Sequence, residues 1–414
     1  MKKSGFTLIE LLAVIAILAI ILVISIPKIL DVIETSKINT LKNTVKLIAD
    51  SAEKKYTENE AFLEEEEITC DSVSKLNKED YNKCTIIFDE NGIAKVSILG
   101  RGKFKGLKVI EATKTNAEVI KLEAPKYGIT AVEYINGLYE YYGDSYNLKI
   151  DNTKDQNVRY YGSDPNNYVR FNNELWRIIG VFNDNVKLVR KDSLGRFSWD
   201  SSESNVNGGW GVNEWSQSAL KNYLNTMYYG GTSVTCYNGQ NKKEVTCPAN
   251  KLDNTSKSLI DNYTWNTGAI ELGKASDTLA FYKDERGNLT GLINNDTVER
   301  TTTWPGYIGL PYATDWAYAS GNDICEVNMR SKDSSNKYIC LNDNWMSKGE
   351  EYWTLSPRAS NVNNIWMVSN FVSVWTNSAS SPYALHPSIY LKNNVQIISG
   401  TGTSSDPYIL KAGV

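Results

Sequence analysis

The stretch that decides the fold is the N-terminal sequence KKSGFTLIELLAVIAILAIILVISIP, residues 2–27. Its apolar part runs from Phe6 to Ile26 and has 21 residues. As an α-helix, a run of this length is about 31 Å long, close to the roughly 30 Å thickness of a bilayer's hydrocarbon core. Lys2 and Lys3 precede it, and basic residues favour the cytoplasmic side. We therefore expect a single-pass membrane helix with the C-terminus outside the cytoplasm.

Glu10 is the unusual residue of this helix. A carboxylate in a membrane span is costly, by about 2.5 kcal/mol or more near the bilayer centre. This cost argues against a plain membrane anchor. An ordinary secretory signal peptide does not account for the segment either, because such signals have a shorter apolar run and a small-residue cleavage site, whereas SIPK follows here at residues 25–28. Cleavage after Gly5 would instead create an α-amine on Phe6, one helical turn before Glu10. That amine could pair with the carboxylate within one chain or between neighbouring chains.

The segment that contains Gly5, Phe6, Glu10 and Pro27 resembles the class III signal of type IV prepilins. The resemblance implies that a prepilin peptidase cuts after Gly5 and N-methylates Phe6. It implies that Glu10 guides subunit registration and that Pro27 kinks the helix. Proline also removes a backbone donor and clashes with the preceding turn, so we expect a kink or local melting at residues 23–27. The implied partners are other pilin subunits, the membrane, and a pilus or secretion assembly platform.

Helical periodicity continues past Pro27 and predicts a helix that ends near Tyr56. Its apolar stripe comprises Leu30, Ile33, Ile38, Leu41, Val45, Ile48 and Ala52. Three strand-like segments follow, at residues 85–88, 93–99 and 103–112, and the first two are joined by a turn at Asn91-Gly92. The pilin resemblance implies that the long helix packs on this small antiparallel sheet.

The six cysteines fall into three pairs that are local in sequence. With a single histidine, His386, and no C-x-x-C motif, a zinc site is not favoured. Cysteines outside the cytoplasm can persist as disulfides. We therefore predict three disulfides, Cys70–Cys84, Cys236–Cys247 and Cys325–Cys340.

The rest of the chain is aromatic-rich, and every tryptophan lies between Trp176 and Trp375. The patterns predict a short helix at 130–142, a polar linker at 143–158, a three-stranded meander at 168–191, a helix at 214–229 and tail strands at 353–357, 365–374, 387–391 and 408–410. We thus expect an α+β chain divided into a leader peptide (1–5), a helix and stalk (6–56), a pilin-type β domain (57–128), a short helix with a linker (129–156) and a C-terminal display domain (157–414).

Residues 157–411 resemble extracytoplasmic domains of Gram-positive bacteria with a C-type-lectin-like or formylglycine-generating-enzyme-like fold. The resemblance is carried by WRII at 176–179, WTLSP at 353–357, HPSIYL at 386–391, GTG at 400–402 and DPYIL at 406–410. It implies a larger, loop-rich α+β domain. The calcium-binding motifs of true C-type lectins do not occur in the sequence, and no calcium site can be assembled at recognisable spacing.

Exposed aromatic rings can stack on sugars, so a glycan or host-surface ligand is one hypothesis for this domain. The alternative is that most of these rings fill the core and that His386 is structural. The candidate ligand-binding residues in turn-rich sequence are Trp304, Tyr307, Trp316, Trp345, Trp366 and Trp375.

Charge and composition exclude several classes of function. Lys and Arg total 44 against 48 Asp and Glu, so there is no basic excess for nucleic-acid binding. One histidine and no recognisable nucleophile motif argue against an enzyme, a metal site or a cofactor. We expect a filament subunit that starts in the cytoplasmic membrane, moves to the cell surface on assembly and displays its C-terminal domain for adhesion. A pseudopilin of a type II secretion or DNA-uptake machine and a membrane-anchored enzyme are the alternatives.

Overall fold

The computed structural model of the chain describes residues 8–62, 67–74, 76–271, 277–287, 301–329, 339–347, 349–359, 361–369 and 373–413. Its contacts divide the chain into two compact units. The first unit comprises Met1–Ala124 and Glu140–Tyr142, and the second comprises Pro125–Tyr139 and Gly143–Val414.

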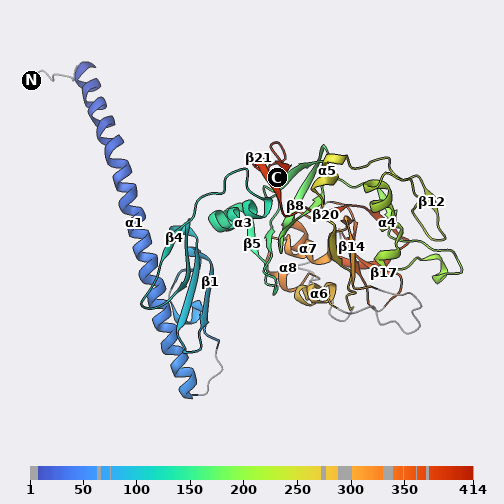
Figure 1. Ribbon diagram of the computed structural model, residues 1–414, viewed down its shortest axis with the longest axis horizontal. Helices are drawn as coiled ribbons and strands as arrows, with labels where there is room; N and C mark the ends of the chain where they lie inside the picture. The colour runs from blue at the N-terminus through green and yellow to red at the C-terminus, as the bar shows by residue number, and fades with distance from the viewer. Residues whose placement is uncertain are drawn as a thin grey trace, which may run out of the picture. The chain divides into compact units, whose positions relative to one another are not determined.

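The first unit is a long helix on a small antiparallel sheet, as expected, and the sheet has four strands (Figure 1). Helix α1 spans Leu8–Phe62, so it ends beyond the predicted Tyr56. The sheet has the order β1-β2-β3-β4, and β4 is a strand that the sequence analysis did not predict. The strands are β1 (Tyr81–Phe88), β2 (Ala94–Gly100), β3 (Leu107–Ala112) and β4 (Val119–Lys121), and the short helices are α2 (Cys70–Val73), η1 (Lys78–Asp80) and η2 (Gly102–Phe104).

Helix α1 continues through Pro27 without interruption. The local melting expected at residues 23–27 is therefore wrong. Proline removes a single intrahelical donor, and the turns on both sides of it keep theirs. The segments before and after Pro27 consequently form one element.

The core of the first unit lies between the C-terminal half of α1 and the sheet (Figure 1). The helix contributes Leu41, Val45, Ile48, Ala49 and Ala52, each no more than 1% exposed. The facing strands contribute Ala94, Val96, Ile98, Leu107, Val109 and Ala112. Burying an aliphatic side chain of this size stabilises a fold by about 1.5–3 kcal/mol, so this stripe fixes the helix on the sheet.

The second unit contains a nine-stranded and a five-stranded sheet. The main path of the larger sheet is β15-β20-β9-β8-β7-β22-β21, with β6 paired to β8 and to β5. The smaller sheet has the order β10-β19-β16-β17-β18. The pairings are antiparallel except for β22 with β7 and β16 with β19. Two further strand pairs are β11-β12 and β13-β14.

The bounds of these elements show which residues build the sheets. The larger sheet comprises β5 (Leu148–Ile150), β6 (Val158–Tyr160), β7 (Tyr168–Phe171), β8 (Glu174–Phe182), β9 (Asn185–Arg190), β15 (Ile308–Gly309), β20 (Ser388–Tyr390), β21 (Val395–Ser399) and β22 (Tyr408–Ala412). The smaller sheet comprises β10 (Arg196–Ser198), β16 (Tyr352–Pro357), β17 (Asn364–Ser369), β18 (Ser373–Ser378) and β19 (Pro382–Ala384). The separate pairs are β11 (Cys236–Tyr237) with β12 (Glu244–Val245), and β13 (Tyr263–Asn266) with β14 (Thr303–Gly306).

Short helices connect these strands. They are α3 (Ala131–Tyr142), η3 (Gly143–Tyr146), η4 (Asn207–Gly209), η5 (Trp215–Gln217), α4 (Ala219–Asn222), η6 (Tyr223–Tyr229), α5 (Asn254–Leu259), α6 (Thr278–Glu285), α7 (Ala313–Tyr318), α8 (Ile324–Val327) and α9 (Ile339–Asn342). Helix α7 contacts β16 and β17 of the smaller sheet, and its Asp315 pairs with Lys187 in β9 of the larger one. It therefore links the two sheets in the core.

Several predicted elements of the second unit are confirmed. The meander is β7-β8-β9, and the helix predicted at 130–142 is α3, which begins with a capping box between Thr130 and Glu133. Two predictions are wrong. Residues 365–374 are not one strand, because β17 and β18 form a hairpin there. Residues 143–158 are not a plain linker, because they contain β5 and the buried side chains of Asp151 and Asn157.

The predicted helix at 214–229 is also divided. The turn η5 is separated from α4 by Ser218, whose hydroxyl caps α4 by accepting from the Lys221 N–H. Helix α4 then passes into the π-helical η6. Serine and other capping residues satisfy the free donors of a helix start, which favours a new start at that point.

Candidate functional site

The first candidate site is the N-terminal half of α1. Its apolar side chains are exposed all around the helix from Leu8 to Ile33, and Figure 1 shows this half extending beyond the sheet. Among the described residues, α1 is the one helix long and apolar enough to cross a membrane, judged by length and composition. Leu30 and Ile33, predicted to belong to the packed stripe, are 58% and 46% exposed. The stripe therefore has a packed part from Ile38 onward and an open part before it.

Glu10 lies in the first turn of α1 and is exposed, and Pro27 lies within the helix. Gly5 and Phe6, the predicted processing residues, lie outside the described residues. The pairing of the Phe6 amine with Glu10 consequently stays a prediction.

Comparison with known proteins bears on this same segment. The family model described as the prokaryotic N-terminal methylation motif matches residues 1–26. No curated protein and no solved structure matches the chain. The motif and the apolar helix together fit a type IV pilin-like or pseudopilin subunit. The motif implies processing by a prepilin peptidase, membrane anchoring and later assembly with other pilin subunits.

The three predicted disulfides are present. Cys70–Cys84 joins α2 to β1, Cys236–Cys247 joins β11 to the segment after β12, and Cys325–Cys340 joins α8 to α9. Each closes a short loop, with sequence separations of 14, 11 and 15 residues. A disulfide that closes a loop of this size contributes roughly 3 kcal/mol when it is unstrained.

Three of the predicted ligand-binding tryptophans are buried. Trp316 and Trp366 are 0% exposed and Trp345 is 4% exposed. The indole N–H of Trp316 donates to Ser347 Oγ at 3.1 Å, and that of Trp345 donates to the Tyr160 carbonyl at 2.9 Å. A ring enclosed on both faces cannot stack on a ligand from solution. The prediction of a stacking role is therefore wrong for Trp316 and Trp366, which fill the core. Trp345 is also buried but borders a pocket described below.

The other three predicted residues reach the surface to different degrees. Trp304 is half-buried and meets Trp215 edge to face. Tyr307 is half-buried and stacks on Tyr229 with ring centroids 4.1 Å apart. Trp375 is 48% exposed on β18, an edge strand of the smaller sheet. A ligand role for these three residues stays a prediction.

Sequence reasoning missed a buried ionic cluster in the second unit. Asp315 accepts from Lys187 Nζ at 2.6 Å and from Arg159 Nη1 at 2.9 Å, and Arg159 Nε donates to Asp151 at 2.6 Å. All four side chains are no more than 1% exposed. Asp315 and Arg159 are 156 residues apart in the chain, so no local pattern could have indicated the pair.

The electrostatics of this cluster follow from burial and pairing. Burial opposes ionisation of Asp315, but Lys187 and Arg159 outweigh it and lower the pKa of that carboxyl. Burial also lowers the pKa of Lys187 to about 8, although Asp315 opposes the shift. The cluster joins α7 to β6 and β9, so its role is to hold the core together.

His386 is fully buried, in agreement with the structural interpretation. Its Nδ1 is 3.1 Å from the Arg190 carbonyl oxygen, and its Nε2 is 3.1 Å from Glu350 Oε1. Among the described residues, no group of three or more His, Cys, Asp or Glu side chains is arranged to hold a metal ion.

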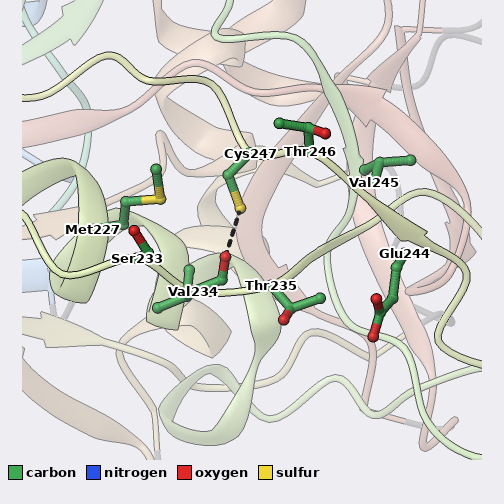
Figure 2. A pocket seen from close by; sticks show the side chains of 8 residues that line it. All are labelled: Met227, Ser233, Val234, Thr235, Glu244, Val245, Thr246 and Cys247. Carbon is green, nitrogen blue, oxygen red and sulfur yellow. Dashed lines mark hydrogen bonds between the residues drawn. The ribbon is translucent and has the colours of Figure 1, made fainter.

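One pocket lies beside the Cys236–Cys247 disulfide. Figure 2 shows that it is bordered by Met227 of η6, by residues 233–235 just before β11, and by β12 with the two residues that follow it. Its volume is about 490 Å³, and Glu244 is its one charged lining residue. Cys247 Sγ is 3.3 Å from the Val234 carbonyl oxygen, a close contact in which the disulfide sulfur has no proton to donate. This lining offers one carboxylate and three hydroxyls but no cation.

A second pocket, of about 460 Å³, lies at the end of β9. Its lining combines two cations, two carboxylates, two hydroxyls and one indole: Arg177, Lys191, Asp192, Ser193, Trp345, Ser347 and Glu350. Both its volume and its convergent polar groups are typical of small-molecule sites.

Proposed function

We propose that this chain is a non-enzymatic structural subunit of a type IV pilus or a related filament. The observation that carries the proposal is the division of α1. Its first half is apolar all around and follows the methylation motif, whereas its second half is fixed to the sheet by the buried stripe from Leu41 to Ala52. One rigid element can thus join an assembly surface to a folded unit.

The open half of α1 needs an apolar environment. Apolar surface kept from water contributes about 25 cal/mol per Å², which either a membrane or a bundle of like helices can supply. In lipid, the Glu10 carboxylate is costly. In a bundle of processed subunits, each Glu10 can meet a Phe6 α-amine, so the charge favours the filament over the membrane.

We propose further that the second unit is displayed outside the cell for adhesion or surface binding. The lectin-like resemblance of residues 157–411, the three disulfides and the exposed Trp375 support this role. The size of the unit favours a minor or tip-associated subunit over a major one. Immunogold labelling of shed filaments tests the proposal. Label along the filament or at its tip is expected, and unlabelled filaments would favour a pseudopilin of a secretion or DNA-uptake machine.

Substitution of the glutamate tests the assembly mechanism. We expect Glu10→Ala to leave membrane insertion intact and to lower incorporation into filaments, because the α-amine loses its counter-charge. Glu58→Ala is the matched control, since Glu58 is exposed near the other end of the same helix. The measurement is the amount of each variant in membranes and in sheared filaments. Equal incorporation of both variants would contradict the pairing argument.

A further inference from the structure

The pocket at the end of β9 is built around a buried arginine. Arg177 lies in β8, and its side chain is 7% exposed to solvent. Its guanidinium lies between two aromatic rings, 4.1 Å from the centroid of Tyr168 and 4.7 Å from that of Trp345. Such stacking favours one orientation of the planar group.

Three of the five donors of this guanidinium are used by the protein. Nε donates to Asn167 Oδ1 at 2.7 Å, and Nη2 donates to Asp164 Oδ1 at 3.0 Å and to the Pro165 carbonyl at 3.1 Å. No hydrogen bond joins Nη1 to any other part of the described chain. Because Arg177 lines the pocket, Nη1 carries the two donors that remain for a ligand.

Lys191 adds a second positive charge at the mouth of the pocket. Its side chain is 41% exposed, and its Nζ is 3.2 Å from Asp192 Oδ1. Two cations and the donors of Nη1 suit an anion. The carboxylates of Asp192 and Glu350 also line the pocket, however, so a strongly charged dianion such as a phosphate monoester would be repelled. A monoanion therefore fits best.

The remaining groups indicate what that monoanion carries. Asp192 and Glu350 accept hydrogen bonds, and the hydroxyls of Ser193 and Ser347 both donate and accept them. Ligand hydroxyls satisfy such a mixture of acceptors and hydroxyls. A sugar ring presents several hydroxyls at once, and a pocket of about 460 Å³ is within the usual range for a small ligand.

We propose that this pocket binds a sugar that carries a carboxylate, such as a uronic acid unit of a surface glycan. The sugar carboxylate pairs with Arg177 Nη1 and Lys191 Nζ, and its ring hydroxyls reach Asp192, Glu350 and the serines. This inference rests on the proposed role of the second unit as a displayed binding domain, and it names the ligand class that the unit recognises.

The test uses the full mature chain in detergent on an array of matched glycans, each acidic sugar printed beside its neutral, carboxyl-reduced counterpart. We expect the acidic member to bind about tenfold more tightly, as a partly buried charge-assisted contact gives. Equal binding of the two members would overturn the proposal. So would a preference for phosphorylated glycans, or for peptides with a free C-terminal carboxylate over all glycans.

Variants assign the binding to this pocket. Lys191→Glu should weaken binding of the acidic sugar about tenfold, because it reverses a charge at the mouth. Lys251→Glu, at an exposed lysine outside the pocket, should leave binding unchanged. Arg177→Lys should weaken binding at least as much as Lys191→Glu, because lysine lacks the planar guanidinium that can donate two parallel hydrogen bonds to a carboxylate. Thermal unfolding shows whether the Arg177→Lys variant is folded. An unchanged affinity in Lys191→Glu would place the sugar elsewhere.

Filament incorporation of the same variants separates this inference from the proposed function. Variants that assemble normally but lose the acidic sugar support the pocket assignment. If the unsubstituted chain enters filaments yet binds no acidic sugar, the pocket inference fails and the assembly role stands. If the chain is not processed at Gly5 and enters no filament, the proposed function itself fails.

Discussion

At the scale of single residues, Asp315 of α7 joins two strands of the larger sheet to its helix, a link that no local motif indicates. Its carboxylate accepts from Lys187 in β9 and Arg159 in β6, and it also accepts from the backbone N–H of Tyr312 at 2.9 Å. Removal of one member of a buried ion pair leaves the others charged and without compensation, which typically costs 3–5 kcal/mol, to order of magnitude.

We therefore expect Asp315→Asn to lower the free energy of unfolding of the second unit by about 3–5 kcal/mol. The matched control is Asp184→Asn, at an exposed position between β8 and β9, which should change it by less than about 0.5 kcal/mol. Urea unfolding of the full chain, followed by tryptophan fluorescence, measures both values. A loss no greater than that of the control would mean that the cluster contributes little to stability.

The same carboxylates predict an acid-sensitive fold. Burial raises the pKa of Asp151, but the Arg159 guanidinium and the side chains of Thr153 and Asn157 outweigh it, so the pKa lies below its ordinary value of 3.8. As the pH falls toward 3.8, the Asp151 carboxyl therefore binds protons more readily in the unfolded chain than in the folded chain. The stabilisation is therefore present above about pH 4 and is lost as the pH falls further.

Unfolding temperatures between pH 2 and pH 7 measure this effect. We expect the midpoint temperature of thermal unfolding of the second unit to fall as the pH drops below about 4. Asp151→Asn should be less stable at neutral pH and should have a flatter profile, because it has no carboxylate to protonate there. A profile parallel to that of the unsubstituted chain would contradict this assignment.

At the scale of elements, one helix carries two different surfaces. The sequence pattern predicts one apolar stripe that contains both Leu30 and Leu41 of α1. Leu30 is 58% exposed and Leu41 is fully buried. A hydrophobic stripe shows that a helix has an apolar face. Residues far along the chain decide which part of that face packs against a sheet.

Leucine truncation tests this division. Leu41→Ala should destabilise the first unit by about 2–5 kcal/mol, because it leaves a cavity against the sheet. Leu47 is 68% exposed on the same helix, so Leu47→Ala should cost far less and serves as the matched control. Thermal unfolding of both variants gives the comparison. Equal losses would mean that the two positions are packed alike.

Other elements show how far local sequence could predict this fold. The disulfide pairs, the β7-β8-β9 meander and α3 depend on short-range patterns, and they were predicted. The β17-β18 hairpin was not predicted. Neither was the folding of residues 143–158, because polar residues there are buried by distant partners. Asn157, for example, donates to Tyr282, which is 125 residues away. The pocket around Arg177 has the same origin, since Arg177 of β8 lies beside Trp345, Ser347 and Glu350 only in the folded unit.

At the scale of the whole molecule, a short N-terminal segment carries the signal for processing and assembly that the methylation motif implies. The methylation motif covers residues 1–26, and the remaining sequence folds into units that do not depend on it for their cores. In the proposed function, processing after Gly5 removes Lys2 and Lys3 and creates the charge that Glu10 meets. Membrane insertion, cleavage and filament entry would then be steps of one mechanism.

The most direct measurement of this mechanism is the mass and sequence of the N-terminal peptide of the mature protein. The account predicts a chain that begins at Phe6 and carries one additional methyl group on its α-amine. An intact Met1, or a cut beyond Ile26, would contradict it.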